Sequence, residues 1–96
     1  MSISVMRRSG TRGMLTVDMG IDIQDTTLRR RAQSSEPRLR DAIRTALSDY
    51  SYRYYRPSSA PDPVMISRLI TQEVDRTLGG PGAHVLLVNV IYQPRS

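Results

Sequence analysis

Residues 15–24 alternate strictly between apolar and polar or small side chains, and this alternation constrains the fold of the chain most. The apolar positions are Leu15, Val17, Met19, Ile21 and Ile23. Between them stand Thr16, Asp18, Gly20, Asp22 and Gln24. A period of two residues predicts a β-strand with one face on a core and the other face in solvent.

A shorter strand is expected just before it. Ile3 and Val5 predict a strand over residues 3–7. The intervening residues 8–13 read as a turn, because the two glycines in that stretch tolerate positive φ angles. The two strands are therefore expected to pair as a hairpin.

Helical spacing begins after residue 25. Residues 25–27 can cap a short helical segment that reaches Arg31 or Gln33, and residues 34–37 mark a second helix start with Pro37 in the first turn. The apolar stripe of this second helix is Leu39, Ile43, Leu47, Tyr50 and Tyr54. A further helix is predicted from Asp62 to a C-cap at Gly79. Its stripe is Ile66, Leu69, Ile70, Val74 and Leu78.

The last predicted element, residues 83–93, is apolar at nearly every position and ends at Pro94. Such a run is typical of a central strand that is covered on both sides. The predicted fold class is therefore α+β: a small β-β-α-α-β domain, one domain over residues 1–96, with two helices packed on one face of a three-stranded sheet.

Composition excludes several kinds of chemistry. The chain of 96 residues has no Cys, which excludes disulfides, thiolate nucleophiles and Cys-ligated zinc. All 14 basic residues are Arg, and the net charge of +5 favours acidic partners. No apolar run reaches the 18 or more residues that a membrane span needs, so any membrane contact is expected through a segment outside these residues.

Candidate catalytic groups are isolated in the sequence. His84 is the single histidine and has no carboxylate near it in the chain. Asp18 and Asp22 lie on one face of the predicted strand, which is more typical of a solvent face than of an acid–base pair. Residues 79–82 are rich in glycine but follow a helix, whereas phosphate loops precede one. We therefore predict no enzyme, and no catalytic, metal-binding or cofactor-binding residue.

Residues 50–56 interleave four tyrosines with two arginines, a combination that favours contact surfaces. Tyr50 and Tyr54 fit the core stripe of the helix, so Tyr52, Arg53, Tyr55 and Arg56 are the candidate interaction residues. Packing of Tyr52 and Tyr55 beneath the loop at residues 57–63 is the structural alternative. Arg29, Arg30 and Arg31 form a second candidate patch, which a solvated helix end also explains.

The ordered set of segments resembles the soluble domain of FliL-like flagellar basal-body-associated proteins. Residues 14–23 are similar to the strand that opens that domain. Residues 36–47 and 69–79 resemble its two helices, and residues 85–93 its closing strand. The membrane anchor of that family is absent here, and residues 50–63 exceed its usual helix–helix connection.

The resemblance implies a stomatin-like (SPFH-like) fold and a periplasmic scaffold, associated with the inner membrane in the full-length protein. It also implies self-assembly into rings and contact with flagellar stator or basal-body proteins, without cofactor or catalysis. The alternative from the residues alone is a small basic module that binds nucleic acid, motivated by the net charge and by the Tyr- and Arg-rich segment.

Overall fold

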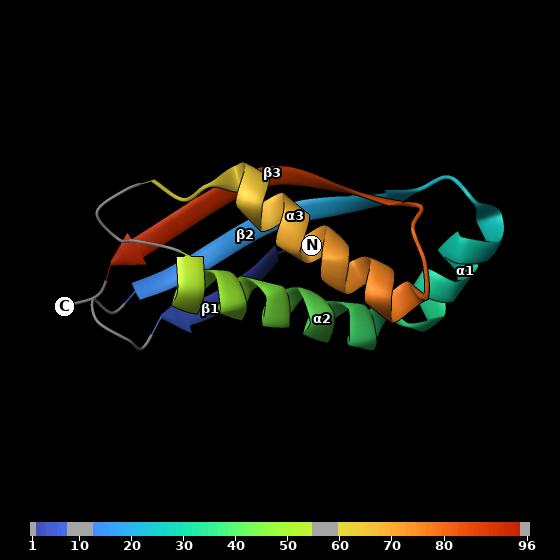
Figure 1. Ribbon diagram of the computed structural model, residues 1–96, viewed down its shortest axis with the longest axis horizontal. Coiled ribbons are helices and arrows are strands. Elements are labelled where there is room, and N and C mark those ends of the chain that lie inside the picture. The colour runs from blue at the N-terminus through green and yellow to red at the C-terminus, as the bar shows by residue number, and fades with distance from the viewer. Residues whose placement is uncertain (1, 8–12, 55–59, 95–96) are drawn as a thin grey trace.

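The computed structural model describes residues 2–7, 13–54 and 60–94. Along the chain these form β1 (Ser2–Arg7), β2 (Gly13–Ile23), α1 (Thr26–Ser34), α2 (Glu36–Asp49), the short π-helix η1 (Tyr50–Tyr54), α3 (Pro63–Leu78) and β3 (Ala83–Pro94) (Figure 1). The predicted turn at residues 8–13 lies almost wholly outside the described residues. None of the described helices is long and apolar enough to cross a membrane.

The three strands form one antiparallel sheet in the order β1-β2-β3. β1 pairs with β2 from Ser2 opposite Asp18 to Arg7 opposite Gly13, so the predicted hairpin is confirmed. β2 then lies between two antiparallel neighbours, because β3 pairs along its whole length. This places the most strictly alternating segment of the chain at the centre of the sheet.

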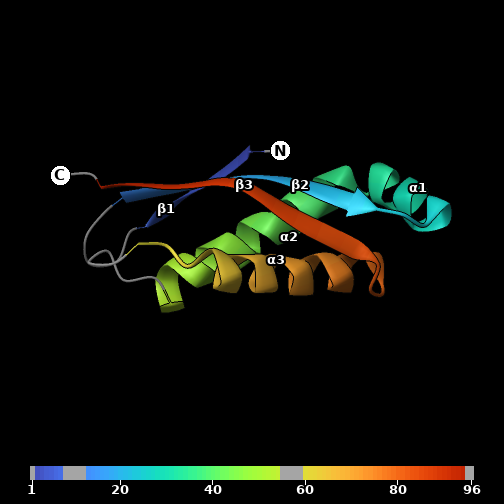
Figure 2. The ribbon, with the colours of Figure 1, turned by 90° about the horizontal axis from the view of Figure 1, so that it is seen from above.

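One face of the sheet is covered by α2 and α3, which lie side by side beneath it (Figure 2). The inward positions Leu15, Val17, Met19 and Ile23 of β2 are buried, and Ile21 is partly buried. Leu47 of α2 and Ile70 of α3 are fully buried against them. The predicted two-layer arrangement, with both long helices on one face, is therefore confirmed.

The domain has one helix more than the predicted β-β-α-α-β order. The short helical segment expected after residue 25 is a separate helix, α1, which begins where the Thr27 N–H donates to Asp25 Oδ1 at 3.0 Å. The chain turns at Ser35, and Pro37 falls in the first turn of α2. α1 lies beyond the end of the sheet rather than on its face (Figure 1).

The prediction of a central, doubly covered last strand is wrong. β3 is an edge strand, and its side chains alternate between the helical layer and solvent. Leu86, Val88 and Ile91 are 57%, 73% and 43% exposed. A bulge breaks the alternation: Asp18 pairs with Asn89 but Met19 pairs with Leu87, so Val88 is an extra residue in β3.

Local signals at the ends of α3 act as expected. Asp62 Oδ1 accepts from the N–H groups of Val64 and Met65 at 3.0 and 3.2 Å, and Pro63 stands in the first turn. Gly79 ends the helix with φ of 84°, a left-handed conformation that glycine adopts without a Cβ clash. These caps hold α3 in register with the turn into β3.

Candidate functional site

The outer edge of β3 has the composition of a contact surface. Its twelve residues contain no Asp, Glu, Lys or Arg, whereas every other helix and strand of the described residues carries at least one charged residue. Natural edge strands are usually protected from pairing with other chains by charges, by proline or by covering elements. β3 has Pro94 at its end and a bulge at Val88, and residues 60–63 lie beside its residues 87–90, but no charged residue protects it.

Apolar surface continues from this edge onto the start of α3. Val64, in the first turn of α3, is largely exposed and faces Leu87 across a shallow hollow of about 450 Å³ that Arg68 also lines. A second hollow of about 360 Å³ lies between residues 60–63 and residues 87–90. We call the outer edge of β3, its exposed side chains and Val64 the β3 surface.

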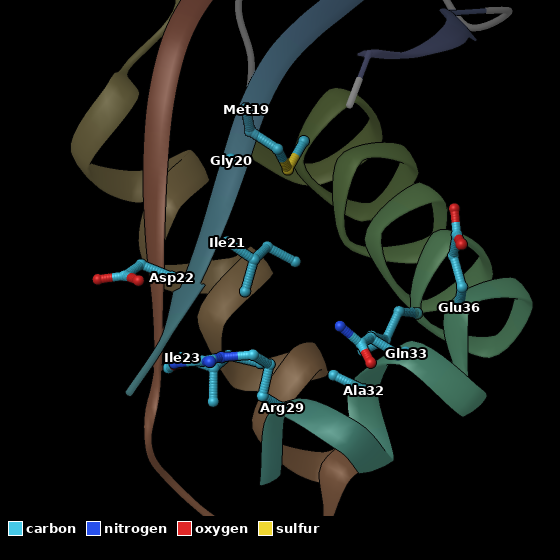
Figure 3. Close-up of a pocket in the computed structure, with 10 residues that line it drawn as sticks. Met19, Gly20, Ile21, Asp22, Ile23, Arg29, Ala32, Gln33 and Glu36 are labelled. Atoms are coloured by element: carbon cyan, nitrogen blue, oxygen red, sulfur yellow. The ribbon is translucent and has the colours of Figure 1, made fainter. Parts of the chain in front are cut away.

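A groove of about 460 Å³ opens at the opposite edge of the sheet, where β1 pairs no further than Asp18 and β2 runs on to Ile23. Figure 3 shows Ile21 and Gln33 directed into it, while Asp22 points away. Arg29 and Glu36 also line it. This mixture of apolar, cationic and anionic groups favours no single class of ligand.

Two of the three arginines in the predicted basic patch stabilise the fold through hydrogen bonds to main-chain carbonyls. Arg29 Nε donates to the Ile23 carbonyl at 2.9 Å and so closes the end of β2. Arg31 Nη1 donates to the Leu78 carbonyl at 3.0 Å, where its positive charge lies at the C-terminus of α3. Arg30 makes no hydrogen bond or ion pair with the described residues, so it is the member of the patch most available to a partner.

The predicted Tyr- and Arg-rich site lies at the other end of the molecule from α1 (Figure 1). Tyr52 is 70% exposed, and Arg53 pairs with Asp49 at 3.1 Å on the surface. Tyr55 and Arg56 lie outside the described residues. The structure therefore keeps the two predicted patches apart, and a single partner surface cannot include both.

Two tyrosines of this segment were expected in the core, and one is there. Tyr50 is buried, whereas Tyr54 is 46% exposed, contrary to prediction. The cause is the change from α2 to the wider turn of η1 at Tyr50, which shifts later side chains away from the stripe. The apolar stripe alone gives no signal of this change.

Tyr50 joins two elements. Its hydroxyl oxygen accepts a hydrogen bond from the Asp62 N–H at 2.7 Å, which ties the end of α2 to the start of α3. Burial raises the pKa of Tyr50, the Asp62 carboxylate raises it further, and the hydrogen bond offsets part of the increase. Tyr50 is thus a structural residue rather than a contact residue.

His84 has a neighbour that the linear sequence does not show. It pairs across the strands with Asp22, and both side chains are exposed on the open face of the sheet. No hydrogen bond joins the two side chains in the part of the chain described. Among those residues, no three His, Cys, Asp or Glu side chains are grouped so that they could hold a metal ion.

Comparison with known proteins gave no family or relative for this chain. No protein-family model, no curated protein and no solved structure matches it significantly.

Proposed function

We propose that this chain is a non-catalytic assembly domain that works by binding other protein chains, including copies of itself. The observation that carries the proposal is the β3 surface: an uncharged edge strand whose side chains Leu86, Val88 and Ile91 are exposed. An open edge of this kind can be extended by a strand from another chain, through main-chain hydrogen bonds. Exposed apolar patches of monomers are commonly binding sites.

The resemblance to FliL-like proteins supports a more specific version of this proposal. In it, the domain lies in the periplasm, has a stomatin-like fold, forms rings and supports the flagellar stator. A ring that is assembled from two-fold dimers needs a second contact surface on each subunit, beyond the one that joins the dimer. The β3 surface is one, and the exposed end of η1 with Tyr52 and Arg53 is our proposal for the other.

Sedimentation velocity of the purified chain, from low micromolar to millimolar concentration, tests the self-association. A sedimentation coefficient that rises with concentration is expected. Direct binding to the purified periplasmic region of the stator subunits from the same source, measured by interferometry, tests the flagellar version. A Tyr52→Ser, Arg53→Ser variant tests the η1 surface in both measurements. A chain that stays monomeric and does not bind the stator region would contradict the proposal.

A further inference from the structure

We propose that two copies of this chain form a two-fold symmetric dimer by pairing their β3 strands antiparallel, which joins the two sheets into one. This inference rests on the proposed function and names the surface, the partner and the symmetry. The pairing segment is residues 83–87, on the N-terminal side of the bulge at Val88.

Among the described helices and strands, β3 is the element along which a second copy can approach without bringing like charges together. In a two-fold interface the same surface lies on both sides, so any charge on it meets a like charge or must be arranged to avoid one. The chain carries a net charge of +5, and like charges placed directly opposite across strands are destabilising. β3 carries no Asp, Glu, Lys or Arg, so its self-pairing brings no such charges together.

The structure favours one half of β3 for this pairing. Residues 60–63 lie beside residues 87–90 and narrow access to that part of the edge. Val88 interrupts regular pairing there, because a bulge kinks its strand and increases the local twist. Residues 83–86 precede both features, and Leu87 borders them. Antiparallel pairing centred on Val85 sets His84 opposite Leu86 of the second copy.

The long dimension of the domain runs along the proposed interface. The domain measures 45 Å along its length and about 20 Å in the other directions, and β3 follows the long axis (Figure 1). A standard interface buries roughly 800 Å² on each partner. On the side of the molecule that carries β3 and the start of α3, Leu86 and Val64 are the exposed apolar side chains that such an interface would bury.

The opposite edge of the sheet is a poorer partner for β3. β1 has six residues, and β1 and β3 run in the same direction because both are antiparallel to β2. Head-to-tail growth that continues the sheet would therefore pair β3 in parallel with β1 of the next copy. Parallel pairing is slightly less stable per residue than antiparallel pairing.

Single-cysteine cross-linking tests the symmetry, because the natural chain contains no Cys. Leu86→Cys places a thiol near the proposed axis, Ser4→Cys places one on β1, and Arg44→Cys on the exposed surface of α2 is the control. Each variant is treated with a short bismaleimide by itself. A mixture of the Leu86→Cys and Ser4→Cys variants is treated in the same way. We expect L86C alone to give covalent dimer roughly tenfold faster than R44C, since pairing raises the effective concentration of the two thiols.

Three outcomes would overturn the inference. Cross-linking in the L86C–S4C mixture but not in L86C alone would show head-to-tail pairing. Association of the parent chain without enhanced cross-linking of L86C would assign self-assembly to another surface, and the proposed function would stand. A parent chain that stays monomeric at all concentrations would contradict the proposed dimer. The proposed function would then depend on stator binding. Circular dichroism confirms that each variant is folded.

Discussion

Arg30 and Arg31 are adjacent in sequence, but they differ in their contacts. Arg31 donates to the Leu78 carbonyl at the C-terminus of α3, and Arg30 makes no contact of this kind with the described residues. We expect Arg31→Met to lower the free energy of unfolding by about 1 kcal/mol, because a hydrogen bond and a favourable helix-dipole contact are lost. Urea unfolding of Arg31→Met and Arg30→Met measures this difference. Equal stability of the two variants would contradict the structural role of Arg31.

Tyr50 gives the domain a pH-dependent contribution to stability. Its pKa in the folded state is raised above the ordinary value of 10.0, mainly by burial. The unfolded chain therefore loses this proton at lower pH than the folded one. The contribution is complete below pH 10.0 and is lost as the pH rises through the folded pKa.

Tyr50→Phe tests this contribution. The variant keeps the ring but leaves the Asp62 N–H without its acceptor, which costs about 1 kcal/mol at neutral pH. Unfolding free energies of parent and variant between about pH 8 and about pH 11 are then compared. The parent is expected to lose its advantage as the pH rises above 10.0. An advantage that stays constant or grows with pH would contradict the account.

At the scale of elements, a single substitution in β3 should weaken self-association while it leaves the stability of the fold nearly unchanged. Leu86→Lys puts a charge at a position that is already exposed, so the free energy of unfolding should change by less than about 0.5 kcal/mol. Two like charges near the dimer axis should weaken self-association roughly tenfold or more, which is ~1.4 kcal/mol. Sedimentation velocity measures the self-association of Leu86→Lys and of the matched control Ser4→Lys on β1. Equal losses in both variants would contradict the assignment.

The elements that could be predicted from the sequence are those with local causes. The hairpin followed from the alternation of residues 15–24, and the limits of α3 followed from Asp62, Pro63 and Gly79. The position of β3 could not be predicted in the same way. Strand order depends on contacts between distant segments. An apolar run is compatible both with a buried central strand and with an edge strand that binds another chain.

In β3 and η1, local irregularities of the backbone change which side chains are buried, and the sequence pattern does not predict them. One extra residue at Val88 changes which later side chains face the helices: Val90 and Tyr92 are partly buried, whereas Ile91 is exposed. The widened turn after Asp49 exposes Tyr54 in a similar way. Of the predicted site residues, Tyr52 and Arg53 are exposed as expected, but Arg29 and Arg31 hold parts of the fold together. The β3 surface was missed, although its lack of charge was a readable signal.

For the whole molecule, the net charge of +5 predicts weak and indiscriminate attraction to nucleic acid. Among the described residues, three surface arginines pair with carboxylates: Arg40 with Glu36, Arg53 with Asp49 and Arg76 with Glu73. These pairs reduce the charge available for phosphates. Titration of labelled DNA of several sequences should show binding that weakens steeply with salt and does not discriminate among them. Tight, sequence-selective binding at physiological salt would favour the nucleic-acid alternative instead.

The central claim is that the β3 edge is the surface through which this domain meets another copy. Amide hydrogen exchange of the unmodified chain, measured at dilute and at concentrated protein, tests it most directly. Strand pairing shields main-chain N–H groups, so peptides covering residues 83–87 should exchange more slowly in the concentrated sample while those of β1 and α2 stay unchanged. Protection that rises with concentration elsewhere, or no change in residues 83–87 although the chain associates, would contradict the account.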